Sequence, residues 1–191
     1  MTHELPDLDQ RLVDAVERLG DAARAMLRRG ALAEGLSLTQ AQLLLRITAD
    51  TAPPQGTGAL AGWLEVSAPT VSDAVQALAR KGLVERGLRS GRAWTATATG
   101  RAVARRLRHW PDPLRAAVGG QPTAAKSVAL ETLLRAIAAL HAGGHISTAR
   151  TCLTCRFFRD GPEAWCTLLE TALTQGGLRV DCSDHEPRTS A

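Results

Sequence analysis

Four cysteines in the C-terminal part of the chain are the residues best suited to chemistry. They are Cys152, Cys155, Cys166 and Cys182, with the spacing C-x2-C-x10-C-x15-C. The close pair can chelate a metal from one turn, whereas the other two thiols must be brought to it by folding of the intervening chain. A segment this small cannot bury a core of its own, so a bound metal would organise it. The spacing therefore predicts a cysteine-rich metal-binding module.

Two kinds of metal site satisfy four thiolates, a tetrahedral structural zinc and an iron–sulfur cube. Zinc ribbons usually present two C-x2-C pairs, and the second pair is absent here. A Cys152–Cys155 disulfide is a third option, which would make a thiol-based oxidant sensor without a metal. His185 follows Cys182 by three residues and could replace a ligand or donate a hydrogen bond to one, although an exposed histidine in a polar tail is commonest on the surface.

The order of residues in the module resembles a known cluster-binding segment. The pattern C-x2-C-x-F-F, then C-x-L, then a distant cysteine is similar to that of high-potential iron–sulfur proteins and related small 4Fe-4S modules. The resemblance implies that the four cysteines are ligands of a 4Fe-4S cluster, which we favour over zinc.

A second informative stretch, residues 67–97, reads as a helix followed by a two-stranded ribbon. Ser67 suits an N-cap, Pro69 the first helical turn and Gly82 the C-terminal end, where a positive φ is needed. Its apolar residues recur at helical spacing: Val71, Val75 and Leu78. The outer face left by this pattern is short and polar: Thr70, Ser72, Asp73 and Gln76. A turn-prone Arg-Ser-Gly-Arg and an alternating, Thr-rich segment then predict the ribbon.

These residues resemble the DNA-binding core of MarR-family winged-helix transcription factors. The matches include Ser67, Pro69, Thr70, Val71, Ser72, Val75, Leu78, Gly82, Leu83, Val84, Arg86, Arg92, Thr97 and Gly100. Ser90 stands where the family usually has an aspartate that braces the wing arginine. The resemblance implies a homodimer that binds double-stranded DNA at a pseudo-palindromic operator.

The resemblance also implies roles for the polar and basic residues of this stretch. The outer face of the helix is expected to meet base edges in the major groove. Arg80, Lys81 and Arg86 are expected near phosphates. Arg92 is expected to enter the adjacent minor groove, and Arg89 is the alternative residue for this contact. Between residues 68 and 108 nine basic residues face two acidic ones, in a chain of net charge +4, and this clustering is typical of a phosphate-binding surface.

The remaining chain predicts helices that support this core. Apolar stripes predict helices over residues 7–29, 39–47, 57–64, 99–110 and 124–141. Gly30 and Gly35 interrupt the first of these, and Pro111 and Pro113 end the helix over residues 99–110. The first and last helices carry more apolar surface than one chain can cover, which favours pairing with a second copy. Gly143-Gly144 reads as a hinge between residues 1–145, a DNA-binding and dimerisation domain, and residues 146–191, the cysteine module.

The sequence as a whole thus predicts a mainly α protein, a winged helix-turn-helix with long dimerisation helices and a small C-terminal cysteine module. Its expected function is DNA-binding transcriptional regulation, with the cysteine site sensing redox state, oxygen or iron. The alternatives are a regulator with a purely structural zinc and an electron-transfer protein. No nucleophile–base pair or Gly-rich phosphate loop points to an enzyme. We expect no membrane span and a cytoplasmic location, and the sequence does not indicate any small-molecule effector.

Overall fold

The computed structural model describes residues 7–49, 56–87, 93–161 and 163–188. Its α-helices are α1 (Leu8–Ala33), α2 (Leu38–Ile47), α3 (Thr57–Leu64), α4 (Ala68–Arg80), α5 (Ala98–Leu107), α6 (Asp112–Gly119) and α7 (Thr123–Ala142). Two short 3-10 helices are η1 (Cys152–Thr154) and η2 (Gln175–Gly177). The strands are β1 (Val84–Arg86), β2 (Trp94–Ala96), β3 (Phe158–Arg159), β4 (Trp165–Cys166) and β5 (Thr171–Ala172). The predicted mainly α, winged helix-turn-helix fold is confirmed.

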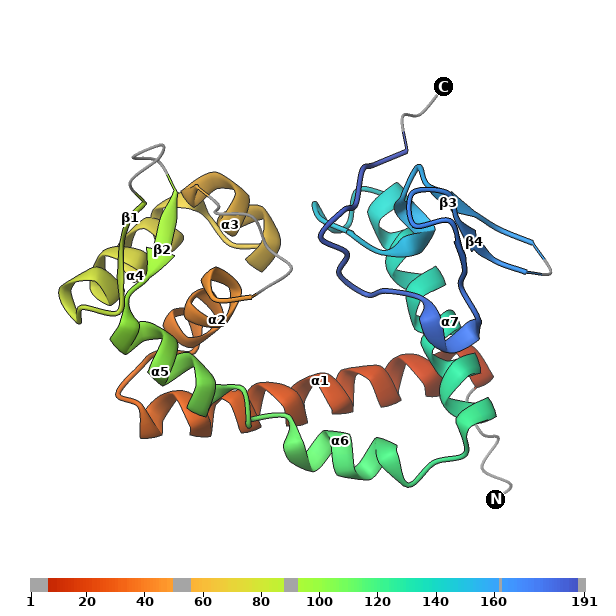
Figure 1. Ribbon diagram of the computed structural model, residues 1–191. Helices are drawn as coiled ribbons and strands as arrows, with labels where there is room; N and C mark the ends of the chain where they lie inside the picture. The colour runs from red at the N-terminus through yellow and green to blue at the C-terminus, as the bar shows by residue number, and fades with distance from the viewer. Residues whose placement is uncertain (1–6, 50–55, 88–92, 162, 189–191) are drawn as a thin grey trace, which may run out of the picture.

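The chain forms two lobes above the long helix α1 (Figure 1). One lobe contains α2 to α5 with the antiparallel pair β1–β2, in which Val84 lies opposite Ala96. The other contains α7 and the cysteine segment, whose sheet has the antiparallel order β3-β4-β5. Helix α6 links the two lobes. None of the described helices is long and apolar enough to cross a membrane.

Each lobe has its own apolar cluster. In the first, α2, α3 and α4 contribute side chains with no exposed surface: Leu43, Leu44, Leu60, Val71, Val75 and Leu78. The second cluster is small and contains Cys152, Cys155, Phe158 and Leu173. The domain boundary at residue 145 stays a prediction.

Two details of the helices differ from the sequence-based expectations. Helix α1 runs through Gly30 to Ala33, because Leu27 and Ala31 are buried in the core and this burial outweighs the roughly 1 kcal/mol helix penalty of one glycine. The second difference is α6, which the sequence analysis did not expect, although α5 does end before Pro111. Pro113 stands in the first turn of α6. Backbone N–H groups in a first turn have no partner within the helix, so proline, which lacks this group, loses no hydrogen bond there.

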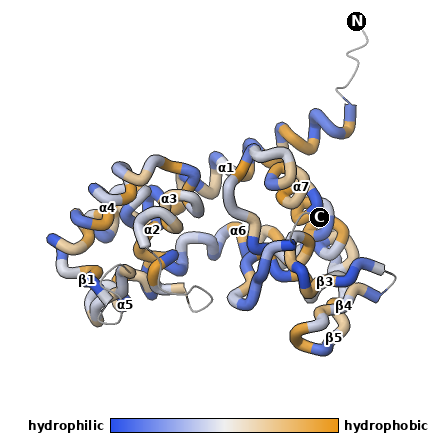
Figure 2. The backbone as a smooth tube through the Cα atoms, turned by 90° about the horizontal axis from the view of Figure 1, so that it is seen from above, coloured by the Kyte–Doolittle hydropathy of each residue, from blue (hydrophilic) through white to orange (hydrophobic). Residues whose placement is uncertain are grey.

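The N-terminal half of α1 extends beyond the rest of the chain (Figure 2). Its large apolar side chains are 48% to 65% exposed: Leu8, Leu12, Val13, Val16 and Leu19. Val128, Leu133 and Leu140 of α7 are also exposed. An apolar stripe of this length is unusual on a monomer and is typical of an interface.

Replacing Gly100 by alanine is expected to destabilise the winged lobe by about 1–3 kcal/mol, the usual cost of overpacking. Gly100, near the start of α5, lies against the backbone of Leu83, and a Cβ added at Gly100 would be 1.9 Å from the Leu83 carbonyl oxygen. The measurement is the free energy of unfolding in urea. Gly58→Ala is the matched control, because a Cβ there meets nothing within 4 Å. Equal stability of the two variants would contradict the close approach.

Candidate nucleic-acid interface and cysteine site

Helix α4 has the ends that the sequence predicted. The Ser67 hydroxyl accepts a hydrogen bond from the Thr70 N–H at 3.3 Å and lies 2.7 Å from the Thr70 hydroxyl. Gly82 has a φ of 68° and lets the chain turn directly into β1. Because both ends are fixed and Val75 is fully buried, α4 is held rigidly on the lobe.

The predicted reading face lies on the outside of α4. Thr70, Asp73 and Gln76 are exposed, and Ser72 is half-buried. Gln76 donates its side-chain N–H to the Ser72 hydroxyl at 3.2 Å, so these two side chains are oriented together. A row of donors and acceptors on a rigid helix can bind the edges of bases in a major groove.

The basic residues expected near phosphates are engaged by the protein in different ways. Arg80 is exposed in the last turn of α4. Lys81 donates to the Gly35 carbonyl oxygen at 2.6 Å and to the Gln40 side chain at 2.9 Å, so a phosphate must compete with these bonds. The Arg86 guanidinium lies 4.0 Å from the ring centre of Trp94 on β2. Arg89 and Arg92 lie outside the described residues.

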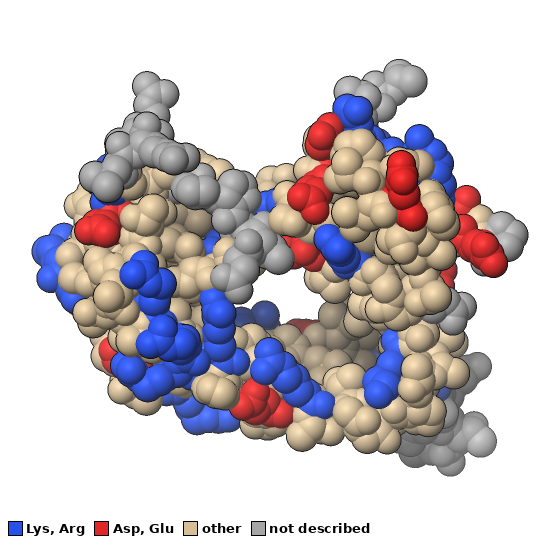
Figure 3. Space-filling model, in the orientation of Figure 1, with Lys and Arg blue, Asp and Glu red and all other residues tan. Residues whose placement is uncertain are grey.

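Charge is distributed unevenly between the two lobes. Lys and Arg gather over the lobe that carries α4 and α5, and Asp and Glu are more frequent over the cysteine lobe (Figure 3). Some of the basic residues support the fold itself. Arg106 forms two hydrogen bonds of 2.7 and 2.6 Å with Glu34, which hold the pKa of that carboxyl below its usual value. Arg101 donates to the Ala96 carbonyl oxygen. Arg101 and Arg106 therefore already have partners within the protein, and fewer basic side chains are available to phosphates than the sequence count suggests.

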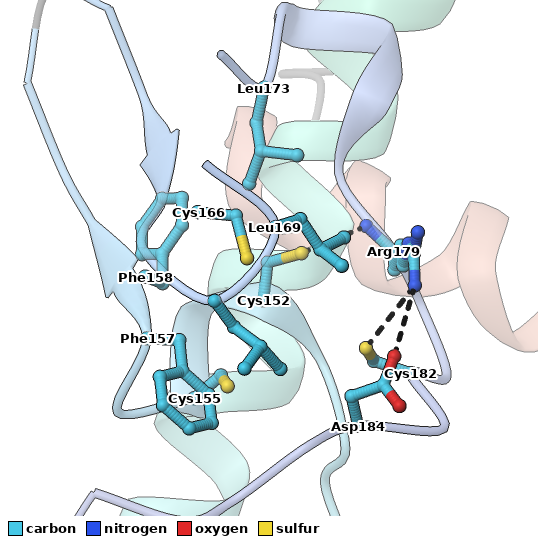
Figure 4. A pocket seen from close by; sticks show the side chains of 11 residues that line it. Cys152, Cys155, Phe157, Phe158, Cys166, Leu169, Leu173, Arg179, Cys182 and Asp184 are labelled. Atoms are coloured by element: carbon cyan, nitrogen blue, oxygen red, sulfur yellow. Dashed lines mark hydrogen bonds and ion pairs between the residues drawn. The ribbon is translucent and has the colours of Figure 1, made fainter. Parts of the chain in front are cut away.

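The four cysteines line one cavity, although they come from three segments of the cysteine lobe (Figure 4). Cys152 opens η1 and Cys155 follows it, with the Cys155 N–H donating to the Cys152 carbonyl oxygen at 3.0 Å. Cys166 lies on β4 opposite Phe158, and the Cys182 N–H donates to the Arg150 carbonyl oxygen at 3.0 Å. All four are free thiols. The folding of 31 residues thus brings together the thiols that the sequence separates.

The walls of the cavity are largely apolar, and the cavity is partly open to solvent. Apolar side chains from three segments complete the lining: Phe157, Phe158, Leu168, Leu169 and Leu173. Burial raises the pKa of the Cys152 thiol, and the backbone N–H of Arg179, which donates to its Sγ at 3.2 Å, acts in the opposite direction. Within the described ranges, no three His, Cys, Asp or Glu side chains converge closely enough to hold a single metal ion.

Arg179 is a cavity residue that the sequence analysis missed. Its Nη1 lies 3.6 Å from the Cys182 Sγ and 3.8 Å from the Asp184 carboxylate (Figure 4). One residue therefore donates to two of the four sulfurs, from its backbone and from its side chain. A cation three residues before a candidate thiolate ligand is the signal that could have identified it.

His185 does not line the cavity. Its Nε2 lies 3.0 Å from the Thr154 hydroxyl, and Thr154 stands between the close pair of cysteines. Burial lowers the pKa of His185. The imidazole therefore braces the η1 turn, which is neither of the two roles at a thiol that the sequence left open for His185.

Comparison with known proteins adds the family context of the fold. No protein-family model matches the chain, and no curated protein matches it. A MarR-family transcriptional regulator from Silicibacter pomeroyi is 27% identical, with a TM-score of 0.59 over 70% of this chain and 92% of that one. A MarR-family regulator from Rhodococcus sp. RHA1 is 19% identical, with a TM-score of 0.55 over 68% of this chain and 95% of that one. CouR from Rhodococcus jostii RHA1, solved with p-coumaroyl-CoA bound, is 18% identical, with a TM-score of 0.56 over 68% and 93% of the two chains. The chain therefore has the winged-helix fold of MarR-family transcriptional regulators.

Proposed function

We propose that the protein is a homodimeric, sequence-specific DNA-binding transcriptional regulator of the MarR type. The observation that carries the proposal is the capped helix α4, which exposes Thr70, Asp73 and Gln76 beside the β1–β2 ribbon that carries Arg86. The exposed apolar stripe of α1 supplies a surface for a second copy. A two-fold dimer would place two α4 helices in half-sites about one helical turn apart, on a pseudo-palindromic operator. No catalytic step is part of this proposal.

The experiment that tests DNA binding starts from duplexes selected from a random library with the full-length protein. Gln76→Ala is expected to relax the sequence preference at one position of each half-site, because a base-edge contact is worth about 1–3 kcal/mol. Arg86→Ala is expected to weaken all duplexes alike and to reduce the slope of log K against log salt by about one unit. Both are measured by fluorescence anisotropy at several salt concentrations.

Arg86→Lys is the control, since it keeps the positive charge but loses the planar stacking on Trp94. Equal losses on selected and random DNA for Gln76→Ala would remove base readout from α4. A chain that selects no sequence at all would contradict the proposed function.

We further propose that Cys152, Cys155, Cys166 and Cys182 hold a 4Fe-4S cluster through which the regulator senses redox state, oxygen or iron. The donor set suits this group, because four thiols face one cavity with apolar walls and two N–H groups of Arg179 already donate to sulfurs. The lack of a second C-x2-C pair, which zinc ribbons usually carry, favours a cluster over zinc.

In this proposal the chain's own residues hold and shield the group. The cysteines ligate it, Arg179 partly neutralises the thiolate charge, and the apolar side chains of the cavity limit access of water. When bound, the cluster would supply one-electron redox chemistry at a potential set by these hydrogen bonds and by exposure. Anaerobic purification followed by iron, sulfide and zinc analysis tests the assignment. A brown protein with broad visible absorption supports it, and a colourless protein with one zinc per chain supports the structural-zinc alternative.

A further inference from the structure

The two lobes touch through residues that neither the reading face nor the cysteine cavity requires. In the space-filling view the lobes meet above an opening bounded below by α1 and α6 (Figure 3). The contacts come from two short segments of the C-terminal lobe, one just after α7 and one beside Cys182. Residues of both segments contact α2 and the end of α3 in the helix-turn-helix lobe.

The first contact joins Arg46 of α2 to Asp181. The side chain of Arg46 is only 3% exposed, and its guanidinium forms an ion pair with the Asp181 carboxylate. The same guanidinium lies 4.7 Å from the ring centre of Trp63 on α3. A buried arginine is strongly unfavourable without its counter-charge. Arg46 therefore depends on Asp181, a residue of the other lobe, for its place between α2 and α3.

Asp181 is in turn fixed by the turn that carries Cys182. The Arg150 guanidinium donates to the Cys182 carbonyl oxygen at 2.6 Å, and its Nε lies 3.6 Å from the Asp181 carboxylate. Cys182 adjoins Asp181 in the chain. A shift of the backbone at Cys182 therefore also shifts the carboxylate that neutralises Arg46.

The second contact joins Ser147 to the turn between α3 and α4. Glu65 ends α3 with a φ of 52°, and its carboxylate accepts from the Ser147 N–H at 2.6 Å and lies 2.9 Å from the Ser147 hydroxyl. These bonds hold the pKa of Glu65 below its usual value. The Ser147 hydroxyl also lies 3.0 Å from the Gly62 carbonyl oxygen, and it reaches α3 closely because Gly62 has no side chain.

We propose that these two contacts, Asp181 to Arg46 and Ser147 to Glu65, transmit the state of the cysteine site to the reading helix. This inference rests on the proposed function. An ordered cysteine segment holds α3, and with it α4, at one position relative to α1, which carries the expected dimer interface. When the thiols lose their metal, the Cys182 turn loosens, Asp181 leaves Arg46, and the separation of the two α4 helices in the dimer is no longer fixed. The metal-loaded form is accordingly the form that binds the operator.

Two substitutions test the transmission without touching the cavity. Asp181→Asn removes the charge that Arg46 requires and keeps the shape of the side chain. Ser147→Ala removes the exposed hydroxyl and keeps the backbone N–H, so folding is not at risk. Glu186→Gln is the matched control, because it breaks an exposed ion pair with Arg156 within the same lobe.

Each full-length variant is reconstituted with iron and sulfide under anaerobic conditions, and operator affinity is measured before and after removal of the iron by a chelator. In the wild type we expect the two affinities to differ by about 5- to 150-fold. In Asp181→Asn the iron content and visible spectrum should match the wild type while this ratio falls toward one. In Ser147→Ala the ratio should fall part of the way toward one, and in Glu186→Gln it should equal the wild-type ratio.

Hydrogen exchange of the α3 amides supplies a second readout that does not depend on DNA or iron. Asp181→Asn and Ser147→Ala are expected to exchange faster than wild type over residues 57–66, with Glu186→Gln unchanged. Unchanged exchange together with an unchanged affinity ratio would overturn the inference. A wild type that binds no iron would instead overturn the cluster assignment, while the exchange measurement would still decide whether the two contacts hold the reading head.

Discussion

Replacing Cys155 by alanine is expected to leave the anaerobically purified protein colourless and to change its operator affinity by about 5- to 150-fold. Cys155 is only 7% exposed and closes the η1 turn beside Cys152, so no water or carboxylate can readily take its place. Three thiolates leave one iron corner without a ligand. Iron and sulfide per chain, visible absorption and operator titration are measured on the same preparation.

Ser183→Ala is the control for this variant, because Ser183 follows Cys182 but does not line the cavity. It should retain full iron and wild-type affinity. If the loaded protein, the chelator-treated protein and Cys155→Ala bind the operator equally while remaining folded dimers, the cysteine site is structural and the sensor proposal fails.

Replacing Leu12 by glutamate is expected to convert the protein to a monomer and to weaken operator binding by roughly 10²–10⁴-fold, the contribution of linking two half-site contacts. Leu12 is 48% exposed in the middle of the apolar stripe of α1. In the proposed dimer this stripe is covered by a second copy, and a carboxylate placed there would be desolvated without a partner. Sedimentation equilibrium measures the association state, and anisotropy measures the affinity.

Gln10→Glu adds the same charge to the opposite face of α1 and should remain dimeric. Circular dichroism checks that both variants keep their helices. A Leu12→Glu protein that sediments as a dimer and binds normally would show that α1 is not the interface, and the exposed residues of α7 would become the next surface to test.

Local chemistry in the sequence was sufficient to predict helix α4 and the grouping of the four cysteines. Ser67 and Gly82 mark the ends of α4 because caps act on their own neighbours in the chain, and Val71, Val75 and Leu78 give its buried face because helical periodicity is local. The clustering of cysteines likewise pointed to one site, and the structure places all four around one cavity.

Only the tertiary structure decided which distant charges meet. Arg46 and Asp181 are 135 residues apart, and no periodicity or cap relates them. Lys81 belongs to the basic reading helix by sequence, yet it bonds to the Gly35 carbonyl oxygen. Helix α6 forms despite Pro113, which has no N–H to lose in a first turn. Pairings of this kind follow from how the helices pack, because a buried charge or a free carbonyl takes whichever partner the fold brings within reach.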